Sequence, residues 1–201
     1  MDPVRFLSNP STGAMGLALA LEMQKRGGQV VLVMGPTQIP VPRKIKVIPV
    51  TTALEMRRTV QSELKKADVF IGAAAVGDWR FEKVAGSKIK KGKARSMTVR
   101  LIKNPDILAE AARALKRSRR KTLVVGFALE TSNRLKNAIH KLETKNLDLV
   151  VANGPESFSG ARTKAVLIDR FKSHKEFLNV SKRKLAAGIA GWLDNQWKNH
   201  P

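Results

Sequence analysis

Two apolar stretches, TLVVGF at residues 122–127 and LDLVVA at residues 147–152, decide the fold of this chain. Each has the length and the continuous apolar character of a strand that is buried on both faces. Residues 132–145, which lie between them, have the pattern of an amphipathic helix. A strand, a helix and a second strand in this order form a βαβ unit, whose two strands run parallel.

The same alternation of short apolar runs and helical patterns continues through the rest of the chain. Further strands are expected at residues 29–34, 46–50, 68–74 and 164–168, and further helices at residues 15–26, 53–64, 105–115 and 181–197. The sequence therefore predicts a single α/β domain over residues 1–201, with a three-layer, Rossmann-like, mostly parallel sheet and helices on both of its faces.

Three helix ends carry local signals. Thr52, with Glu55 three residues later, predicts a capping box at the start of the second helix. Asn104 followed by Pro105 predicts an N-cap with proline at the first helical position of the third helix. Gly27 follows the first helix, where glycine can adopt the left-handed conformation that ends a helix.

The composition restricts the chemistry. There is no cysteine among the 201 residues, so disulfides, thiolate nucleophiles and cysteine metal ligands are excluded. The three histidines, His140, His174 and His200, share no ligand spacing. No apolar stretch approaches the roughly 18 residues that span a bilayer, and no signal-peptide pattern begins the chain, so a cytoplasmic protein without membrane contact is expected.

The formal net charge of +22 comes from 38 Lys and Arg against 16 Asp and Glu. Such a surface attracts polyanions, but most of this charge is expected to cover ordinary solvated surface. A non-enzymatic, basic nucleic-acid-binding domain is one hypothesis that follows. The aromatic content of 5% argues against a platform that stacks bases, and no specific nucleic-acid partner is expected.

Residues 79–97 are polar and basic and have no obvious element of their own, and loops of this length are functional or disordered in compact domains. The segment Lys88-Ile89-Lys90-Lys91 lies inside this loop, between Gly86 and Gly92. Lysines on a mobile basic flap can neutralise phosphate charge while the closed flap excludes water. On composition alone, a solubilising lysine run explains the same residues.

Three further segments suit a phosphorylated ligand. Residues 8–16 form a small polar loop that leads into a helix N-terminus, and a plain capping loop is the alternative. Residues 72–78 follow a buried strand with very small side chains and end at Asp78, which a turn-capping role also explains. Lys141 and Lys145 are four residues apart on one helix face, as on many solvated helices.

Together these segments resemble phosphopantothenoylcysteine synthetase, the ligase half of the bifunctional bacterial coenzyme A enzyme. The resemblance covers nearly the whole chain and rests on several blocks in the same order. The blocks are residues 2–9 with Gly13, Met15 and Gly16; residues 52–56, 74–76 and 78–80; residues 88–91 and 103–107; residues 125–128 with Glu130 and Thr131; and residues 145–148 with Ala152 and Asn153.

The resemblance implies a two-step ligation. The carboxylate of 4′-phosphopantothenate attacks the α-phosphate of CTP with release of pyrophosphate, and the amine of cysteine then displaces CMP from the acyl-cytidylate. Positioning and charge neutralisation by lysines, helix ends and Mg²⁺ can support this chemistry without a protein nucleophile. A homodimer and an upstream flavin-dependent decarboxylase domain are also implied.

Residue roles carried over from the family are expectations. Asn9 is expected to hold the acyl-cytidylate, Arg5 to belong to the same substrate-binding segment, and Lys88 to be the essential lysine of the flap. The resemblance assigns no metal ligands. The residues expected around the nucleotide, besides Lys88, are Ala73, Ala74, Asp78, Lys91, Pro105, Asp106, Ile107, Leu108, Phe127, Lys141 and Lys145.

The chain also departs from the family. Members begin with a strand and a glycine-threonine turn that cradles phosphate, whereas this sequence starts at Met1, so that strand and turn are expected to be absent. Ala14 and Gly154 replace a lysine and an aspartate of the family pattern. A nucleotide-dependent oxidoreductase on a Rossmann-like sheet is the remaining alternative, although the sequence lacks the glycine fingerprint of such enzymes.

Overall fold

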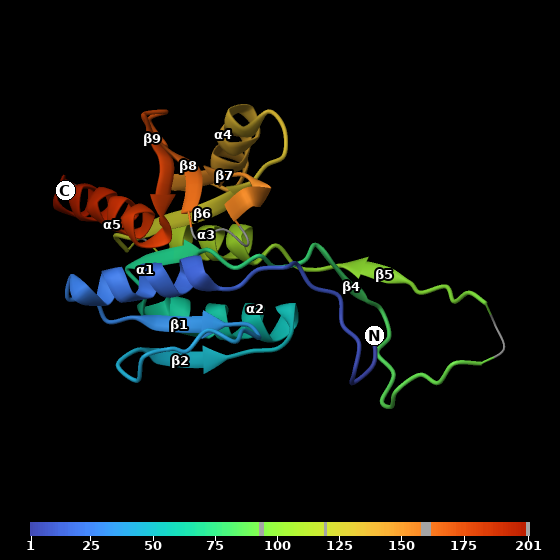
Figure 1. Ribbon diagram of the computed structural model, residues 1–201. Coiled ribbons are helices and arrows are strands. Elements are labelled where there is room, and N and C mark those ends of the chain that lie inside the picture. Colours follow the sequence, from blue (N-terminus) through green and yellow to red (C-terminus); the bar gives the residue numbers. More distant parts are fainter. Residues whose placement is uncertain (93–94, 119, 158–161, 200–201) are drawn as a thin grey trace.

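The computed structural model describes residues 1–92, 95–118, 120–157 and 162–199. Its main sheet has five strands in the order β3-β6-β7-β8-β9 (Figure 1). The strands are β3 Val69–Gly72, β6 Leu123–Leu129, β7 Leu149–Asn153, β8 Arg162–Asp169 and β9 His174–Ser181. The first three run parallel, whereas β8 is antiparallel to both β7 and β9.

A second, two-stranded parallel sheet consists of β1 Val31–Met34 and β2 Lys46–Pro49. Within the described part of the chain, neither of its strands pairs with the main sheet. The helices and short 3-10 turns are α1 Ala14–Lys25, α2 Ala53–Glu63, η1 Leu64–Lys66, α3 Ile107–Arg117, α4 Arg134–Thr144, η2 Pro155–Ser157 and α5 Lys182–Asn199.

The main sheet lies between two helical layers. Helices α2, α3 and α4 cover one face, where Val124 of β6 and Val150 of β7 belong to the buried cluster. Helices α1 and α5 cover the other face together with Val125 and Val151. Because neighbouring residues of β6 and β7 point to opposite buried faces, both strands are apolar without alternation.

A buried carboxylate at the amino end of β7 joins this strand to β6, to α3 and to the end of β8. Asp148 is 1% exposed and accepts a hydrogen bond from the backbone N–H of Val124, at 2.8 Å. Its other oxygen receives Lys116 Nζ at 3.0 Å and Arg170 Nη1 at 3.2 Å. A buried charge is tolerated when it is paired and hydrogen-bonded in this way.

The predicted α/β class, with helices on both faces, is confirmed. Each of the six predicted strands and five predicted helices is present, within a few residues of its expected ends. The main sheet is mixed, however, because two of its strands run antiparallel to their neighbours. Of these, β9 was missed because Phe177 and Val180 are its only buried residues and no apolar run marks the strand.

The helix-end predictions have different outcomes. The capping box at Thr52 and Glu55 is confirmed, and Gly27 has a φ of 88° after the end of α1. The N-cap predicted at Asn104 is wrong. Asp106 caps α3 instead, since its Oδ1 accepts the backbone N–H of Ala109 at 3.0 Å.

The prediction that residues 79–97 have no element of their own is also wrong. β4 Trp79–Phe81 pairs antiparallel with β5 Leu101–Lys103, so the segment is an arm with a two-stranded ribbon at its base. The arm extends away from both sheets (Figure 1). Three-residue strands without an apolar run carry little periodic signal, and the pairing partner lies beyond the predicted loop.

Among the described residues, no helix combines the length and apolarity that a membrane span requires.

Two glycines of α5 provide a matched test of the packing on β9. A Cβ added to Gly188 would lie 2.3 Å from Cζ of Phe177, whereas one added to Gly191 meets nothing within 4 Å. Overpacking costs about 1–3 kcal/mol, and alanine at an open helical position gains about 0.5–1 kcal/mol over glycine. We expect Gly188→Ala to lower the Tm by several degrees and Gly191→Ala to raise it slightly in thermal unfolding. Equal shifts for the two variants would contradict this packing.

Candidate functional site

The start of α3 lies unusually close to the ends of two parallel strands. Gly72 of β3 and Gly126 of β6 are register partners. A Cβ on Gly126 would stand 2.7 Å from Cδ2 of Leu108, and one on Gly72 would stand 3.0 Å from Cδ1 of the same side chain. The absence of both Cβ atoms lets Leu108 pack directly against the backbone and brings the first turn of α3 to the strand ends.

The turn that follows β3 is held by Asn104, which the sequence had predicted to be the N-cap of α3. Asn104 donates its backbone N–H to the carbonyl of Asp78, at 2.8 Å, and its side-chain amide to the carbonyl of Gly77, at 2.7 Å. Arg80 donates to Oδ1 of the same asparagine at 3.4 Å. The turn with its exposed Asp78 is thereby joined to the segment that enters α3.

Lys141 of α4 and Lys145, which caps the end of the same helix, face this region. Lys141 donates its Nζ to the backbone carbonyl of Phe127 at 2.7 Å. Lys145 forms an ion pair with Asp106, at 2.7 Å between Nζ and Oδ2. The spacing of four residues therefore places both ammonium groups on one side of the helix, and each is held at the edge of the sheet or at the start of α3.

The pKa values in this group are shifted. Burial lowers the pKa of Lys141, and repulsion by the ammonium of Lys145 lowers it further. Burial is the largest single influence on the pKa of Asp106 and acts to raise it, but the hydrogen bonds from Lys145 and from the backbone N–H of Ala109, together with the charges of the two lysines, lower the pKa overall. The carboxylates of Glu130, Asp106 and Asp78 act in the opposite direction without reversing the shift, so a bound phosphate would further stabilise the charged form of Lys141.

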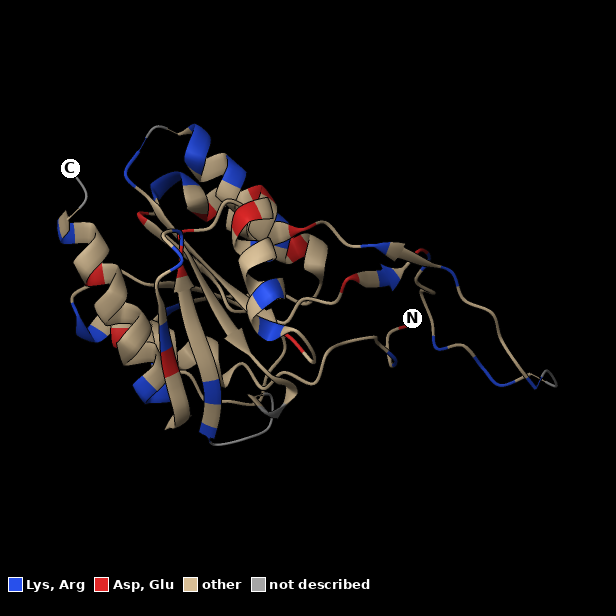
Figure 2. Cartoon of the chain, turned by 90° about the horizontal axis from the view of Figure 1, so that it is seen from above, with Lys and Arg blue, Asp and Glu red and all other residues tan. Residues whose placement is uncertain are grey.

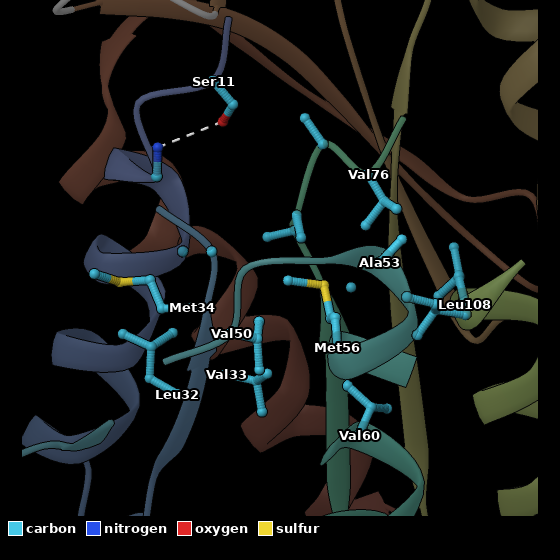
Figure 3. A pocket seen from close by; sticks show the side chains of 18 of the residues that line it. Ser11, Leu32, Val33, Met34, Val50, Ala53, Met56, Val60, Val76 and Leu108 are labelled. Carbon is cyan, nitrogen blue, oxygen red and sulfur yellow. Dashed lines mark hydrogen bonds between the residues drawn. The ribbon is translucent and has the colours of Figure 1, made fainter. Parts of the chain in front are cut away.

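Most of the predicted site residues line one cavity of about 2950 Å³. It extends from the space between β1 and β3, shown from close by in Figure 3, to the turn after β3 and the lysines of α4. The predicted residues that line it are Arg5, Asn9, Ala73, Ala74, Asp78, Pro105, Asp106, Ile107, Leu108, Phe127, Lys141 and Lys145. Lys88 and Lys91 do not line it and are exposed on the arm.

Asn9 connects the N-terminal segment to the strand end. Its Nδ2 donates to the backbone carbonyl of Ala75 at 3.1 Å. The loop that leads into α1 also borders the cavity through Ser11 and Gly13. The predicted phosphate loop, the small-residue turn and the asparagine therefore meet at one end of the cavity.

The arm is attached to the N-terminal segment by Asp2, a residue that the sequence interpretation did not single out. Asp2 is 6% exposed and accepts hydrogen bonds from the backbone N–H groups of Val4 and Arg5, each at 2.9 Å, and of Ile89, at 3.1 Å. The Arg5 guanidinium binds the same carboxylate and donates to the Ile89 carbonyl at 2.9 Å. We call these three residues the arm clamp. The Asp2-Pro3 pair, which is typical of a turn, was the sequence signal that could have pointed to Asp2.

The arm clamp fixes the residue next to Lys88. The hydrogen bond from the Arg5 side chain holds the pKa of Asp2 well below its usual range, although burial opposes this, and the backbone donors lower it further. Because the pKa is depressed in the folded state, the stabilisation is present above the ordinary carboxyl pKa of about 3.9 and is lost only as the pH falls through the lower, folded value.

Lys and Arg residues are distributed over the helices, the strands and the arm (Figure 2). No three His, Asp or Glu side chains come together as a metal-binding group in the part of the chain that the structure describes.

Replacement of Asp2 by asparagine tests the arm clamp. Asp2→Asn removes the charge that Arg5 binds, so we expect amides of residues 85–90 to exchange with solvent about tenfold faster in hydrogen–deuterium exchange. In the unmodified chain, protection of these amides is expected to persist from pH 7 to pH 4 after correction for intrinsic exchange. Asp194→Asn, which removes a surface partner of Arg26, is the control. Unchanged exchange in Asp2→Asn would show that the arm is held by other contacts.

Comparison with known proteins was made for the whole chain. Residues 1–196 match the family described as "DNA/pantothenate metabolism flavoprotein C-terminal domain". The Coenzyme A biosynthesis bifunctional protein CoaBC of Escherichia coli (strain K12) is 46% identical over 155 residues, which cover 76% of this chain and 37% of that protein. The chain spans less than half the length of several such curated relatives.

Solved structures agree with this match. The crystal structure of the C-terminal domain of Coenzyme A biosynthesis bifunctional protein CoaBC has a TM-score of 0.81 at 28% identity and covers 98% of this chain and 89% of that one. A Cab2 variant in complex with phosphopantothenate-cysteine has a TM-score of 0.76 at 18% identity, over 98% and 82% of the two chains, and shares the fold. With the family match over residues 1–196, this chain belongs to the DNA/pantothenate metabolism flavoprotein C-terminal domain family.

Proposed function

We propose that the chain is a phosphopantothenate–cysteine ligase domain of coenzyme A biosynthesis, which activates 4′-phosphopantothenate with CTP and couples it to cysteine. The observation that carries the proposal is the cavity at which Asn9, the turn after β3 and the two lysines of α4 meet. The names of the similar proteins support the pathway, and the ligand of the Cab2 variant supports the product.

In the first step, an oxygen of the phosphopantothenate carboxylate bonds to the α-phosphorus of CTP while the bond to pyrophosphate breaks. In the second, the amine of cysteine bonds to the acyl carbon, CMP leaves with the bonding electrons, and the amine loses a proton. Negative charge has to be neutralised in both steps, and fixed cations and backbone N–H groups do this best where water is excluded.

Lys141 and Lys145 are proposed to bind the phosphate chain. Lys141 already lies at the cavity wall with a lowered pKa, so an incoming phosphate raises that pKa and keeps the side chain charged. Lys145 can release Asp106 or bridge it to the nucleotide. The carbonyls around Ala73 and Ala74 and the carboxylate of Asp78 are proposed to contact the nucleoside, at the place where ligands bind in open α/β sheets.

Asn9 and Arg5 are proposed to hold the acyl-cytidylate, and Lys88 and Lys91 to approach it from the arm. Asn9 donates one side-chain N–H to the carbonyl of Ala75, and its second N–H and its Oδ1 can bind a substrate. Lys88 directly precedes Ile89, the arm residue that the arm clamp holds. A lysine on an arm adds positive charge when the arm closes and withdraws it for product release.

Magnesium is proposed to enter with the nucleotide. Mg²⁺ is usually held by one or two carboxylates together with substrate phosphates, and it does not need a site made only of protein ligands. Bound to the nucleotide, the ion would supply positive charge to the phosphate chain.

The remaining partners follow from the family. We propose that the domain works in the cytoplasm, as a homodimer, next to a flavin-dependent decarboxylase domain of a longer protein. The family match favours this ligase over the oxidoreductase and the nucleic-acid binder.

The arm lysine is tested by pyrophosphate release. We expect release from CTP in the presence of 4′-phosphopantothenate and Mg²⁺, and a loss of about 100-fold or more in Lys88→Gln, because a transition-state charge contact is removed. Lys83→Gln, which changes an exposed lysine on the same arm, should leave the rate unchanged. No release of pyrophosphate by the unmodified chain would reject the proposal.

Lys141 should affect binding more than folding. In Lys141→Met, an apolar side chain replaces a half-buried ammonium, so the relief of desolvation offsets the lost hydrogen bond to the Phe127 carbonyl, and we expect a nearly unchanged Tm and about tenfold weaker CTP binding by calorimetry. Lys136→Met changes an exposed lysine of the same helix and serves as the control. Equal CTP affinity in the two variants would remove Lys141 from the nucleotide site.

A further inference from the structure

The basic run between α3 and β6 takes no part in the site described above. Lys116 and Arg117 are the last residues of α3, and Arg120 and Lys121 lie shortly before β6. No residue from 116 to 121 is aromatic, so the run by itself supplies cations but no ring on which a base could stack. The fold brings both kinds of side chain together.

The run lies at the amino ends of the parallel strands. Arg120 donates to the carbonyl of Lys65 at 2.6 Å and pairs with Asp68 at 3.0 Å, directly before β3. Asp148, which binds the end of α3, directly precedes β7. Because β3, β6 and β7 run parallel, this end of the sheet is opposite to the strand ends that carry the candidate site.

Two exposed aromatic side chains from distant parts of the sequence reach the same end. Lys121 donates its Nζ to the carbonyl of Trp197 at 2.6 Å and lies 4.7 Å from the centroid of its ring. Arg170 binds Asp148, and its guanidinium lies 5.2 Å from the ring centroid of Phe171. Phe171 is 71% exposed and Trp197 is 37% exposed. In Figure 1, the C-terminal end of α5, which carries Trp197, points away from the arm.

The surface around these rings has an excess of cations. We call it the basic end, and its residues are Lys65, Lys66, Lys116, Arg117, Arg120, Lys121, Arg170, Phe171, Lys172, Trp197 and Lys198. Four of its cations, Lys65, Lys66, Arg117 and Lys198, are exposed and have no ion-pair partner in the described part of the chain. A surface of this kind attracts a chain of negative charges.

We propose that the basic end binds a single strand of nucleic acid without sequence preference. The phosphates lie on the exposed cations, and unpaired bases stack on the rings of Phe171 and Trp197. Surfaces that bind single strands combine these two elements, cations along the backbone and aromatic rings under the bases, and every base offers a face for stacking.

An anionic membrane suits the basic end less well. A membrane surface is bound by a broad apolar face that enters the headgroup region, together with cations around it. Of the exposed large apolar side chains in the described residues, only Phe171 and Trp197 come from the segments of the basic end. Each of the two rings has a cation beside it, which favours stacking with bases over insertion among lipid chains.

This binding is additional to the proposed ligase activity and does not depend on it. The basic end and the cavity lie at opposite ends of the parallel strands, so a bound strand leaves the cavity open. The tests below use neither CTP nor phosphopantothenate, and their outcome is independent of the ligase assay.

The salt dependence of binding tests the cations. The probe is a fluorescein-labelled oligouridylate of about 15 nucleotides, followed by fluorescence anisotropy at about 50 to 300 mM KCl. Each phosphate contact on a single strand contributes about 0.7 to the slope of log K against log salt, so we expect Lys66→Gln with Arg117→Gln to lower the slope by about 1.4. Lys83→Gln with Lys136→Gln removes the same charge from exposed positions of the arm and of α4 and should leave the slope unchanged. Equal losses in the two double variants would show attraction by net charge alone and overturn the proposal.

Substitution of Phe171 tests the stacking. We expect Phe171→Leu to bind the oligouridylate about fivefold or more weakly with an unchanged salt slope, and Phe171→Trp to retain the affinity. Since the side chain is 71% exposed, the Tm should not change in either variant. Phosphatidylcholine vesicles with phosphatidylglycerol are the membrane probe. Binding to these vesicles but not to the oligouridylate, or an undiminished affinity of Phe171→Leu, would overturn the proposal.

Discussion

The burial of β6 and β7 on both faces is the constraint on which the rest of this molecule depends. Strands without a solvent face need helices on both sides, and the two core clusters provide them. These two strands run parallel and are joined by a helix, which places Lys141 of α4 beside Phe127 of β6. At the amino end of β7, the paired carboxylate of Asp148 keeps the buried backbone in register.

The sequence predicted the central part of the fold for the same reason. A strand buried on both faces has a continuous apolar run, so β6 and β7 could be located from residues alone. β9 could not, because Phe177 and Val180 are its only buried residues and no continuous apolar run marks the strand. The arm ribbon was missed because its strands are short. The capping residue of α3 was misassigned because Asn104 and Asp106 both suit an N-cap, and only the path of the turn after β3 separates them.

The candidate site was predictable to the extent that residue type reveals chemistry. Lysines four residues apart on a helix necessarily share a face, and small residues after a buried strand allow close approach. What the sequence did not contain was the identity of their partners. The contacts of Lys145 with Asp106 and of Asn104 with Gly77 join residues about 30 to 40 positions apart, and no local pattern encodes such pairs. Asp2 was missed because its importance lies in one long-range donor, Ile89.

The arm clamp has a consequence for the kinetics of closure. A lysine at the tip of a free, extended arm explores a large volume, and its effective concentration at any one point is correspondingly low. Because Ile89 is tied to Asp2 and Arg5, Lys88 lies one residue away from an attachment to the N-terminal segment that carries Asn9. The volume that its ammonium searches relative to that segment is then set by the reach of a single side chain. The entropy of bringing that charge to a ligand is therefore largely lost during folding, before any ligand binds.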